Sequence, residues 1–340
     1  DALNTVGGDV LIAGMPLLNV MDQFEYVVSV GGDIDLLGLG IPQINGWSSL
    51  LVHDGAIRIT DNAGPFTIGA FPKLTAIGHE LAIERNSILQ EVPGFIALTS
   101  VGALGTPGLG DSELRFTDND AMTSFNGVKG VTRVGGLVFD GNGGIDSVAG
   151  FVDLTVIDGP LLVIDNDAVE SLVGYSALTE IGGTLVITDN LNLASVQAFD
   201  LVSRVGGAIV IGFNRDQTLI DAFAVLTEAG GYELTSGTNL VTIDPMPLLT
   251  AITGDLRLDS QALLAAAPVM PALRTVGGDV VVTGTAALTS LDGWLGIESV
   301  DGDLTITDNT ALSTSEAEAL LDAIGVENIG GAVTLSGNAP

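Results

Sequence analysis

The sequence predicts a mainly β, parallel β-solenoid of about fourteen coils, and three observations support this prediction. First, a short phrase recurs along the chain, as in Val-Gly-Gly-Asp-Val-Leu-Ile from Val6 and Ile-Gly-Gly-Thr-Leu-Val-Ile-Thr-Asp-Asn from Ile181. Second, most phrase starts lie 23 or 24 residues apart, a fixed period that is typical of stacked coils. Third, apolar and polar residues alternate within each phrase, which is the period of a β-strand.

The phrase starts also divide the chain into elements, and we expect one solenoid domain over residues 1–340. The fourteen starts are Gly7, Gly31, Asp54, Gly78, Asp111, Gly135, Asp158, Gly182, Gly206, Gly230, Thr253, Gly277, Asp301 and Gly330. The 33-residue step after Gly78 contains a glycine-rich insertion near 102–110, which lacks the Gly-Lys-Ser/Thr ending of a phosphate-binding loop. The 29-residue step after Asp301 contains a predicted capping helix at 313–324, where Ser313 and Glu316 form a capping box.

Within one coil, the alternation predicts which side chains face the core. Leu185 and Ile187 are expected to point inward, and Val186 outward. The rest of each coil carries spaced apolar residues, which predict a return path with short convex helical turns. The inward pair recurs at Ile57 and Ile59, Leu114 and Phe116, Ile209 and Ile211, Val280 and Val282, and Leu304 and Ile306.

Asparagine recurs eight residues after many of the phrase starts. An amide at this corner can bond to the backbone of its own turn and to the next coil, so we interpret the column as a structural ladder. Its members are Asn62, Asn86, Asn119, Asn166, Asn190, Asn214, Asn309 and Asn338.

The composition limits the partners that are expected. The net charge is −32 with ten Lys plus Arg, which disfavours nucleic acid and anionic membrane surfaces. The chain has no cysteine, which excludes disulfides and thiolate metal sites. No apolar stretch is long enough to cross a bilayer, so we expect no membrane insertion. Because the sequence starts at Asp1 without Met, we expect a processed or trimmed secreted protein.

The order Leu-x-Ile-x-x-Asn, then spaced leucines, then Val-Gly-Gly resembles the leucine-rich-repeat-like right-handed β-helix of receptor L domains. It is also similar to related repeat proteins of bacterial and fungal cell surfaces. The resemblance covers nearly the whole chain, although this chain lacks every cysteine and has more coils than one L domain. The resemblance implies an extracellular or cell-surface location and a non-enzymatic role.

The sequence shows no amphipathic cap before the first repeat. The run Ala2–Val10 matches the interior run Ala272–Val280 nearly residue for residue, so the chain begins inside a repeat. Either the chain is a fragment, or its ends pair with other copies head to tail, which would build a fibre or surface layer. The alternative function is a receptor-like or adhesin-like module that binds an extracellular protein or glycan.

An apolar strip is a candidate interface. If the coils stack in register, outward mid-strand positions form a column, and a contiguous exposed apolar column often marks a contact site. A covering loop would be the structural alternative. The expected strip is Phe139, Leu162, Val186, Val210 and Leu234.

Two acidic columns are candidate calcium sites, and no other cofactor is expected. Stacked carboxylates repel one another unless water or a cation relieves the repulsion, and calcium favours clustered oxygens. Solvated acid is the alternative, since no known calcium-binding loop is present. The columns are Asp118, Asp140, Asp165 and Asp189, and Asp255, Asp279 and Asp303.

Enzymatic function is not predicted. His53 and His79 lie one coil apart, but no nucleophile elbow or zinc motif accompanies them. Arg58, Arg115 and Arg257 occupy outward mid-strand positions in separate coils, whereas a polysaccharide-cleaving site needs converging acids and a base.

Overall fold

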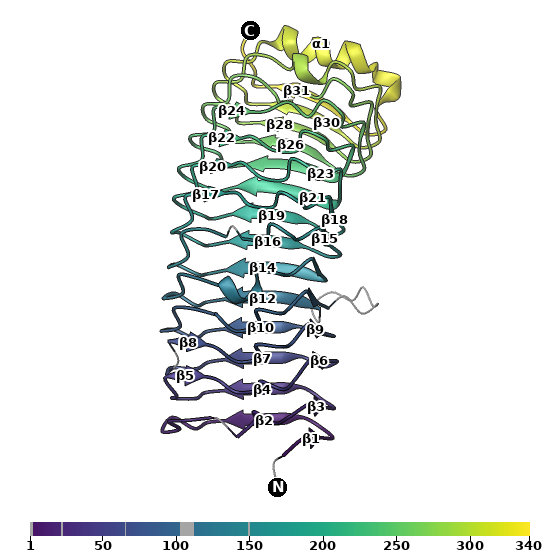
Figure 1. Ribbon diagram of the computed structural model, residues 1–340. Coiled ribbons are helices and arrows are strands. Elements are labelled where there is room, and N and C mark those ends of the chain that lie inside the picture. Colours follow the sequence, from purple (N-terminus) through teal and green to yellow (C-terminus); the bar gives the residue numbers. More distant parts are fainter. Residues whose placement is uncertain (1–2, 22, 65, 103–111, 149) are drawn as a thin grey trace. The chain divides into compact units, whose positions relative to one another are not determined.

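The computed structural model describes residues 3–21, 23–64, 66–102, 112–148 and 150–340. Internal contacts divide the chain into two compact units, residues 1–168 and 169–340. Each unit is a parallel β-solenoid of stacked coils, which confirms the predicted fold class (Figure 1). The insertion predicted near 102–110 lies, apart from Gly102, outside the described residues.

In the first unit, one strand from each coil joins a column of parallel neighbours. Leu81 pairs in register with Ile57 on one side and with Leu114 on the other, and the same register continues through the column. The inward side chains of these strands are fully buried, as at Ile57 and Ile59. The column contains β2 (Val10–Ala13), β4 (Ile34–Leu37), β7 (Ile57–Thr60), β10 (Leu81–Glu84), β12 (Glu113–Thr117), β14 (Gly136–Asp140) and β16 (Leu161–Ile164).

The second unit repeats this arrangement. Val280 pairs with Leu256 and with Leu304, and all three side chains are fully buried. The column contains β19 (Leu185–Thr188), β21 (Arg204–Gly212), β23 (Glu228–Thr235), β26 (Leu256–Asp259), β28 (Val280–Thr283), β30 (Leu304–Thr307) and β31 (Val333–Ser336).

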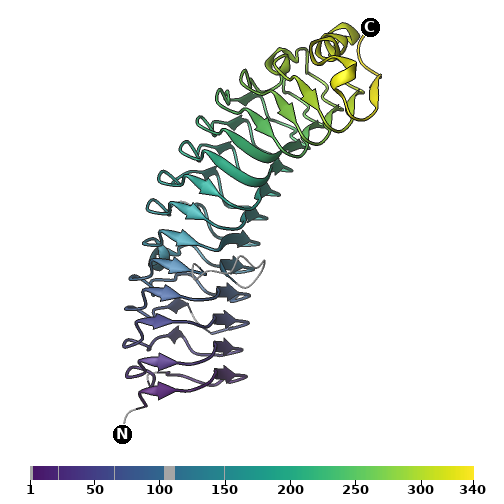
Figure 2. The same ribbon diagram turned by 90° about the vertical axis from the view of Figure 1, so that its right-hand side faces the viewer.

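The strands of these two columns are here called the main strands. A short strand precedes most of them, and a sharp corner separates the two. Each solenoid unit therefore shows two rows of arrows in side view (Figure 2). In the first unit these strands are β1 (Thr5–Val6), β3 (Ser29–Val30), β6 (Val52–His53), β9 (Ala76–Ile77), β11 (Ser100–Val101), β13 (Arg133–Val134) and β15 (Val156–Ile157). In the second unit they are β18 (Glu180–Ile181), β25 (Ala251–Ile252), β27 (Thr275–Val276) and β29 (Ser299–Val300), while β21 and β23 run through the corner.

Among the described residues the return path consists of extended segments and turns, and the short helical turns expected there occur as 3-10 turns at η1 (Asn126–Val128), η2 (Asp292–Trp294) and η3 (Val326–Asn328). Buried aromatic rings stack along this path and fill its width, as between Trp47 and Phe71 at 5.4 Å and between Phe199 and Phe223 at 5.7 Å. Its strands are β5 (Gln43–Ile44), β8 (Thr67–Ile68), β17 (Ser171–Leu172), β20 (Ser195–Val196), β22 (Leu219–Ile220) and β24 (Thr242–Ile243).

The residue that follows each main strand turns the chain through a left-handed conformation. Asp118 has φ +53° and Gly141 has φ +66°, for example. Only glycine adopts this conformation without cost, and Asp and Asn tolerate it better than most residues. The recurrent Asp and Gly after the strand therefore reflect backbone geometry.

The one α-helix within the described ranges, α1 (Thr314–Ile324), confirms the helix predicted at 313–324. The Ser313 hydroxyl oxygen accepts a hydrogen bond from the Glu316 N–H at 3.1 Å, and Gly325 ends the helix with φ +82°. Ala317, Leu320 and Ile324 are buried, so α1 packs its apolar stripe at the C-terminal end of the second unit (Figure 1). The structure has about twelve turns, fewer than the fourteen coils predicted.

Candidate functional site

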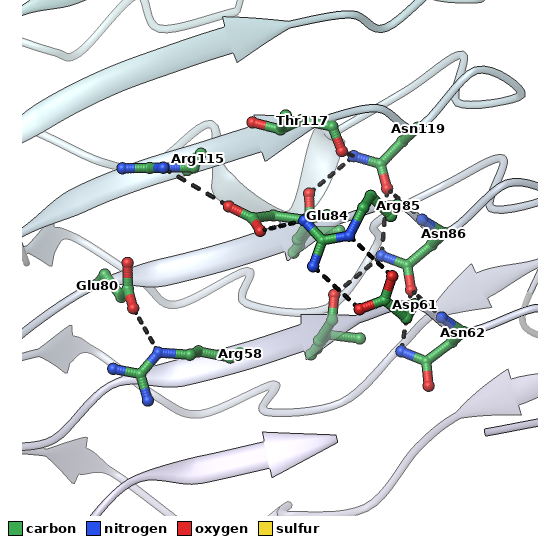
Figure 3. Close-up of polar contacts among 12 residues, drawn as sticks. Arg58, Asp61, Asn62, Glu80, Glu84, Arg85, Asn86, Arg115, Thr117 and Asn119 are labelled. Atoms are coloured by element: carbon green, nitrogen blue, oxygen red, sulfur yellow. Dashed lines mark hydrogen bonds and ion pairs between the residues drawn. The ribbon is translucent and has the colours of Figure 1, made fainter. Parts of the chain in front are cut away.

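The asparagine side chains of the first unit form a buried ladder (Figure 3). The amide oxygen of Asn119 accepts hydrogen bonds from the backbone N–H and the side-chain Nδ2 of Asn86, at 3.1 and 3.2 Å. Nδ2 of Asn119 in turn donates to the carbonyl of Ile83 in the preceding coil at 2.7 Å. Each side chain therefore satisfies backbone groups of its neighbours. The rungs are Asn62, Asn86, Asn119, Asn142 and Asn166, all fully buried.

Asn142 is a rung that the sequence analysis missed. Its amide oxygen accepts from the N–H of Asn119, and its N–H donates to Asn166. In the second unit, Asn190 bonds to Asn214 and Asn309 bonds to Asn338. Thr285 occupies the rung below Asn309, and its N–H donates to the Asn309 amide oxygen at 3.0 Å.

The expected apolar strip is wrong at two of its five positions. Phe139 and Leu234 are fully buried and point into the core. The outward residues of those strands are Val138, which is in register with Leu162, and Glu233, which is in register with Val210. Leu162 belongs to the first unit, and Val186 and Val210 belong to the second; all three are half-buried.

The four residues of the first acidic column do not all occupy the same position in their coils. Asp118, Asp165 and Asp189 are the left-handed corner residues of their coils, whereas Asp140 is the last residue of β14 and Gly141 takes the corner. Burial raises the pKa of Asp140, and the nearby charges of Asp118 and Asp165 raise it further. Protons therefore bind Asp140 more readily than an isolated aspartate.

The second acidic column has a structural role. Oδ1 of Asp255 accepts a hydrogen bond from the N–H of Asp279 at 2.8 Å, and Oδ1 of Asp279 accepts from the N–H of Asp303 at 2.8 Å. Oδ1 of Asp303 accepts from the N–H of Ala332. In the first unit, Asp9 and Asp33 bond in the same way to the following coil. One oxygen of each carboxylate thus stabilises the corner before the main strand.

This role predicts different effects of two substitutions. Asp279→Ala leaves the N–H of Asp303 without its acceptor and is expected to lower the free energy of unfolding by about 1 kcal/mol. Asp279→Asn keeps an oxygen acceptor and is expected to change stability by less than half as much. Urea unfolding of the two variants tests this. The carboxylate charge would matter if both variants lost the same free energy of unfolding. The same conclusion would follow if Asp279→Asn lost more than Asp279→Ala only when calcium is present.

Among the residues that the structure describes, no group of three or more His, Asp or Glu side chains is arranged to hold a metal ion. The calcium prediction therefore rests on the sequence columns alone.

A charged face of the first unit joins acids and arginines of successive coils (Figure 3). Nε of Arg58 lies 2.5 Å from Glu80, and its Nη1 lies 2.8 Å from Asp33. Arg115, two coils further along, lies 3.8 Å from Glu84 and also contacts Glu113. Partly exposed pairs of this kind contribute about 0–1 kcal/mol each, so their main effect is to fix the side chains across the coils.

The two histidines occupy different environments. His53 is buried in β6, where Nε2 lies 3.1 Å from the carbonyl oxygen of Ala56 and Nδ1 has no hydrogen-bond partner. Burial lowers the pKa of His53. His79, one coil further, is exposed. The pair therefore does not present two imidazoles to a common ligand.

Comparison of the chain with protein-family models, with curated proteins and with solved structures finds no match. Within the described ranges, no helix combines the length and apolar character needed to span a membrane. The fold and its ladders define the class as a parallel β-solenoid stabilised by side-chain hydrogen bonds between coils.

Proposed function

We propose that the chain is a non-catalytic, extracellular structural or adhesive repeat protein of the leucine-rich-repeat-like, receptor L-domain-like kind. It self-associates through the ends of its solenoid, without a bound cofactor. The observation that supports this proposal is that six large apolar side chains of the first two coils are exposed. They are here called the N-terminal apolar surface: Leu11, Leu17, Val20, Tyr26, Val28 and Leu51.

The composition of this surface differs from that of the coils that follow. Leu17 is 88% exposed and Leu11 is 65% exposed. Val28 and Leu51 precede β3 and β6 at the position that Thr75 and Thr99 occupy before β9 and β11. Clustered exposed apolar side chains often mark a contact with another protein.

The terminal strands add hydrogen-bonding capacity to the solenoid ends. Within the part of the chain that the structure describes, β2 pairs with β4 and β31 pairs with β30, each with that one strand neighbour. An unpaired strand edge can accept a strand from another chain, and a head-to-tail contact propagates into a fibre. α1 packs near β31, so association at that end would involve the helix as well.

The proposal predicts that Leu11→Asp combined with Leu51→Asp shifts the protein to monomers, because charge replaces the apolar contact. Light scattering after size-exclusion chromatography, together with electron microscopy, measures the assembly. Association should strengthen from low to about 0.5 M salt, because salt screens the repulsion between chains of charge −32.

Ile96→Asp provides the matched control, since Ile96 is 66% exposed on a later coil of the same unit. It should leave assembly unchanged. A protein that stays monomeric at high concentration across salt and calcium conditions contradicts self-association. The alternative is then a receptor-like or adhesin-like module for a protein or glycan, which a polar hollow in the first unit favours.

A further inference from the structure

The polar hollow lies on the return path of the first unit and has a volume of about 270 Å³. Glu91 and Ser124 continue the strand column of β8 through single bridges, and η1 then follows Ser124 and Phe125. The hollow lies between this coil and the next one. Its polar lining consists of Thr123, Ser124, Asn126, Lys129, Asp146 and Ser147.

Lys129 gives the hollow a positive charge within a strongly acidic protein. The chain has only two lysines, Lys73 and Lys129. In the described part of the chain, no carboxylate lies within 4.0 Å of the Lys129 ammonium group, whereas most arginines are ion-paired. The Lys129 charge is therefore available to a ligand.

The backbone of Gly150 positions the Lys129 side chain. A Cβ atom at Gly150 would lie 2.7 Å from Cε of Lys129 and 3.2 Å from its Cγ and Cδ, so the lysine stem runs directly over this glycine. Gly150 also has φ +126°, a conformation that favours glycine. The lysine stem thus lies against Gly150 at the edge of the hollow, while the side chain as a whole is exposed.

The other lining groups indicate the ligand chemistry. Hydroxyls and an amide both donate and accept hydrogen bonds, and the carboxylate of Asp146 accepts them. One ammonium beside these groups matches a ligand that carries one carboxylate and several hydroxyls. The volume is just below the usual range for ligand pockets, which begins at about 300 Å³, so one small ring fits better than a peptide.

We propose that this hollow binds an acidic monosaccharide unit, a uronic acid, with its carboxylate on Lys129 and its hydroxyls on the surrounding polar groups. The net negative charge of the protein does not prevent this contact. At physiological ionic strength charges further away than about 8 Å are largely screened, so the field inside the hollow is set by Lys129 and by Asp146 of the lining rather than by the net charge of the protein.

Titration with D-glucuronate and with D-glucose tests the proposal, because the two sugars differ only in the carboxylate. Nuclear magnetic resonance shifts of the full chain report weak binding directly. Glucuronate is expected to bind with a dissociation constant in the millimolar range, and glucose at least tenfold more weakly. Lys129→Met should weaken glucuronate binding about tenfold, while Lys73→Met should leave it unchanged.

Gly150→Ala tests the positioning of Lys129 without removing its charge. Its Cβ displaces the lysine stem, so glucuronate binding should weaken although the net charge stays the same. Circular dichroism verifies that each variant is folded. Equal binding of the two sugars, or undiminished glucuronate binding by Lys129→Met, overturns the proposal, and so does the absence of shifts with either sugar.

Discussion

Asn119→Ala is expected to lower the free energy of unfolding by about 3–5 kcal/mol. The substitution leaves the backbone N–H and Nδ2 of Asn86 without their common acceptor and removes the donor to the carbonyl of Ile83. These groups are buried, so water does not replace the lost partners. Each unsatisfied buried group costs about 1–3 kcal/mol.

Urea unfolding and amide hydrogen exchange measure this loss. Exchange should accelerate first at Asn86 and its neighbours, because a solenoid loses contacts locally between adjacent coils. Asn126→Ala is the control, since Asn126 is exposed and lies outside the ladder. A loss no greater than that of Asn126→Ala would show that the ladder contributes little.

The recurrent phrase predicted the solenoid, the inward aliphatic pairs and α1, because each depends on periodicity or on a local cap. The assignment of inward and outward side chains failed where the segment between Gly-Gly and the strand is one residue shorter than in other coils. Val134-Gly135-Gly136-Leu137 lacks the residue that separates the second glycine from the strand in Val6-Gly7-Gly8-Asp9-Val10. Counting from the phrase start therefore placed Phe139 outward and overlooked Asn142.

The same deletion explains the error at Leu234. β21 contains Val205-Gly206-Gly207-Ala208 where β23 contains only Ala229-Gly230-Gly231, and the register between the two strands shifts at this point. Because side chains alternate with a period of two, a one-residue slip reverses every assignment in the strand. Counting the residues between each Gly-Gly and the following aliphatic pair would have corrected both assignments, those of Phe139 and Leu234.

The acidic columns could not be interpreted from the sequence because their partners are backbone groups. Asp279 directly precedes its strand and accepts an N–H from the following coil, whereas Asp118 directly follows its strand and occupies a left-handed corner. Only the structure distinguishes a hydrogen-bond acceptor from a conformational preference. Lys129 was missed for a similar reason, since the hollow forms only when two consecutive coils stack on each other.

Lowering the pH below 6.5 is expected to destabilise the first unit through His53. Burial lowers the pKa of His53 in the folded state from its usual value of 6.5. Above pH 6.5 the imidazole is neutral in both states and contributes nothing. Below it the unfolded chain binds a proton that the folded chain cannot, until the pH reaches the lowered folded pKa.

The surroundings of His53 explain why protonation is unfavourable. Nε2 already contacts the Ala56 carbonyl, so a proton on Nδ1 would lie buried without an acceptor. Asp33 and Asp54 attract the positive charge and His79 repels it, but burial outweighs these effects. Burial raises the pKa of Asp33, yet hydrogen bonds from Ala56 and Arg58 outweigh it and lower that pKa below 3.8. Asp33 therefore loses its stabilising charge only at lower pH.

His53→Ile isolates this contribution. Ile77 is the register partner of His53 in the next coil, so isoleucine continues the aliphatic column and removes the unpaired nitrogen. Urea midpoints between pH 6.5 and 4.5 should fall less steeply in this variant than in the parent chain. If His53→Ile keeps the full pH dependence, the acid sensitivity originates in the charged face around Arg58 instead. The buried imidazole would then be a neutral packing residue without influence on the pH response.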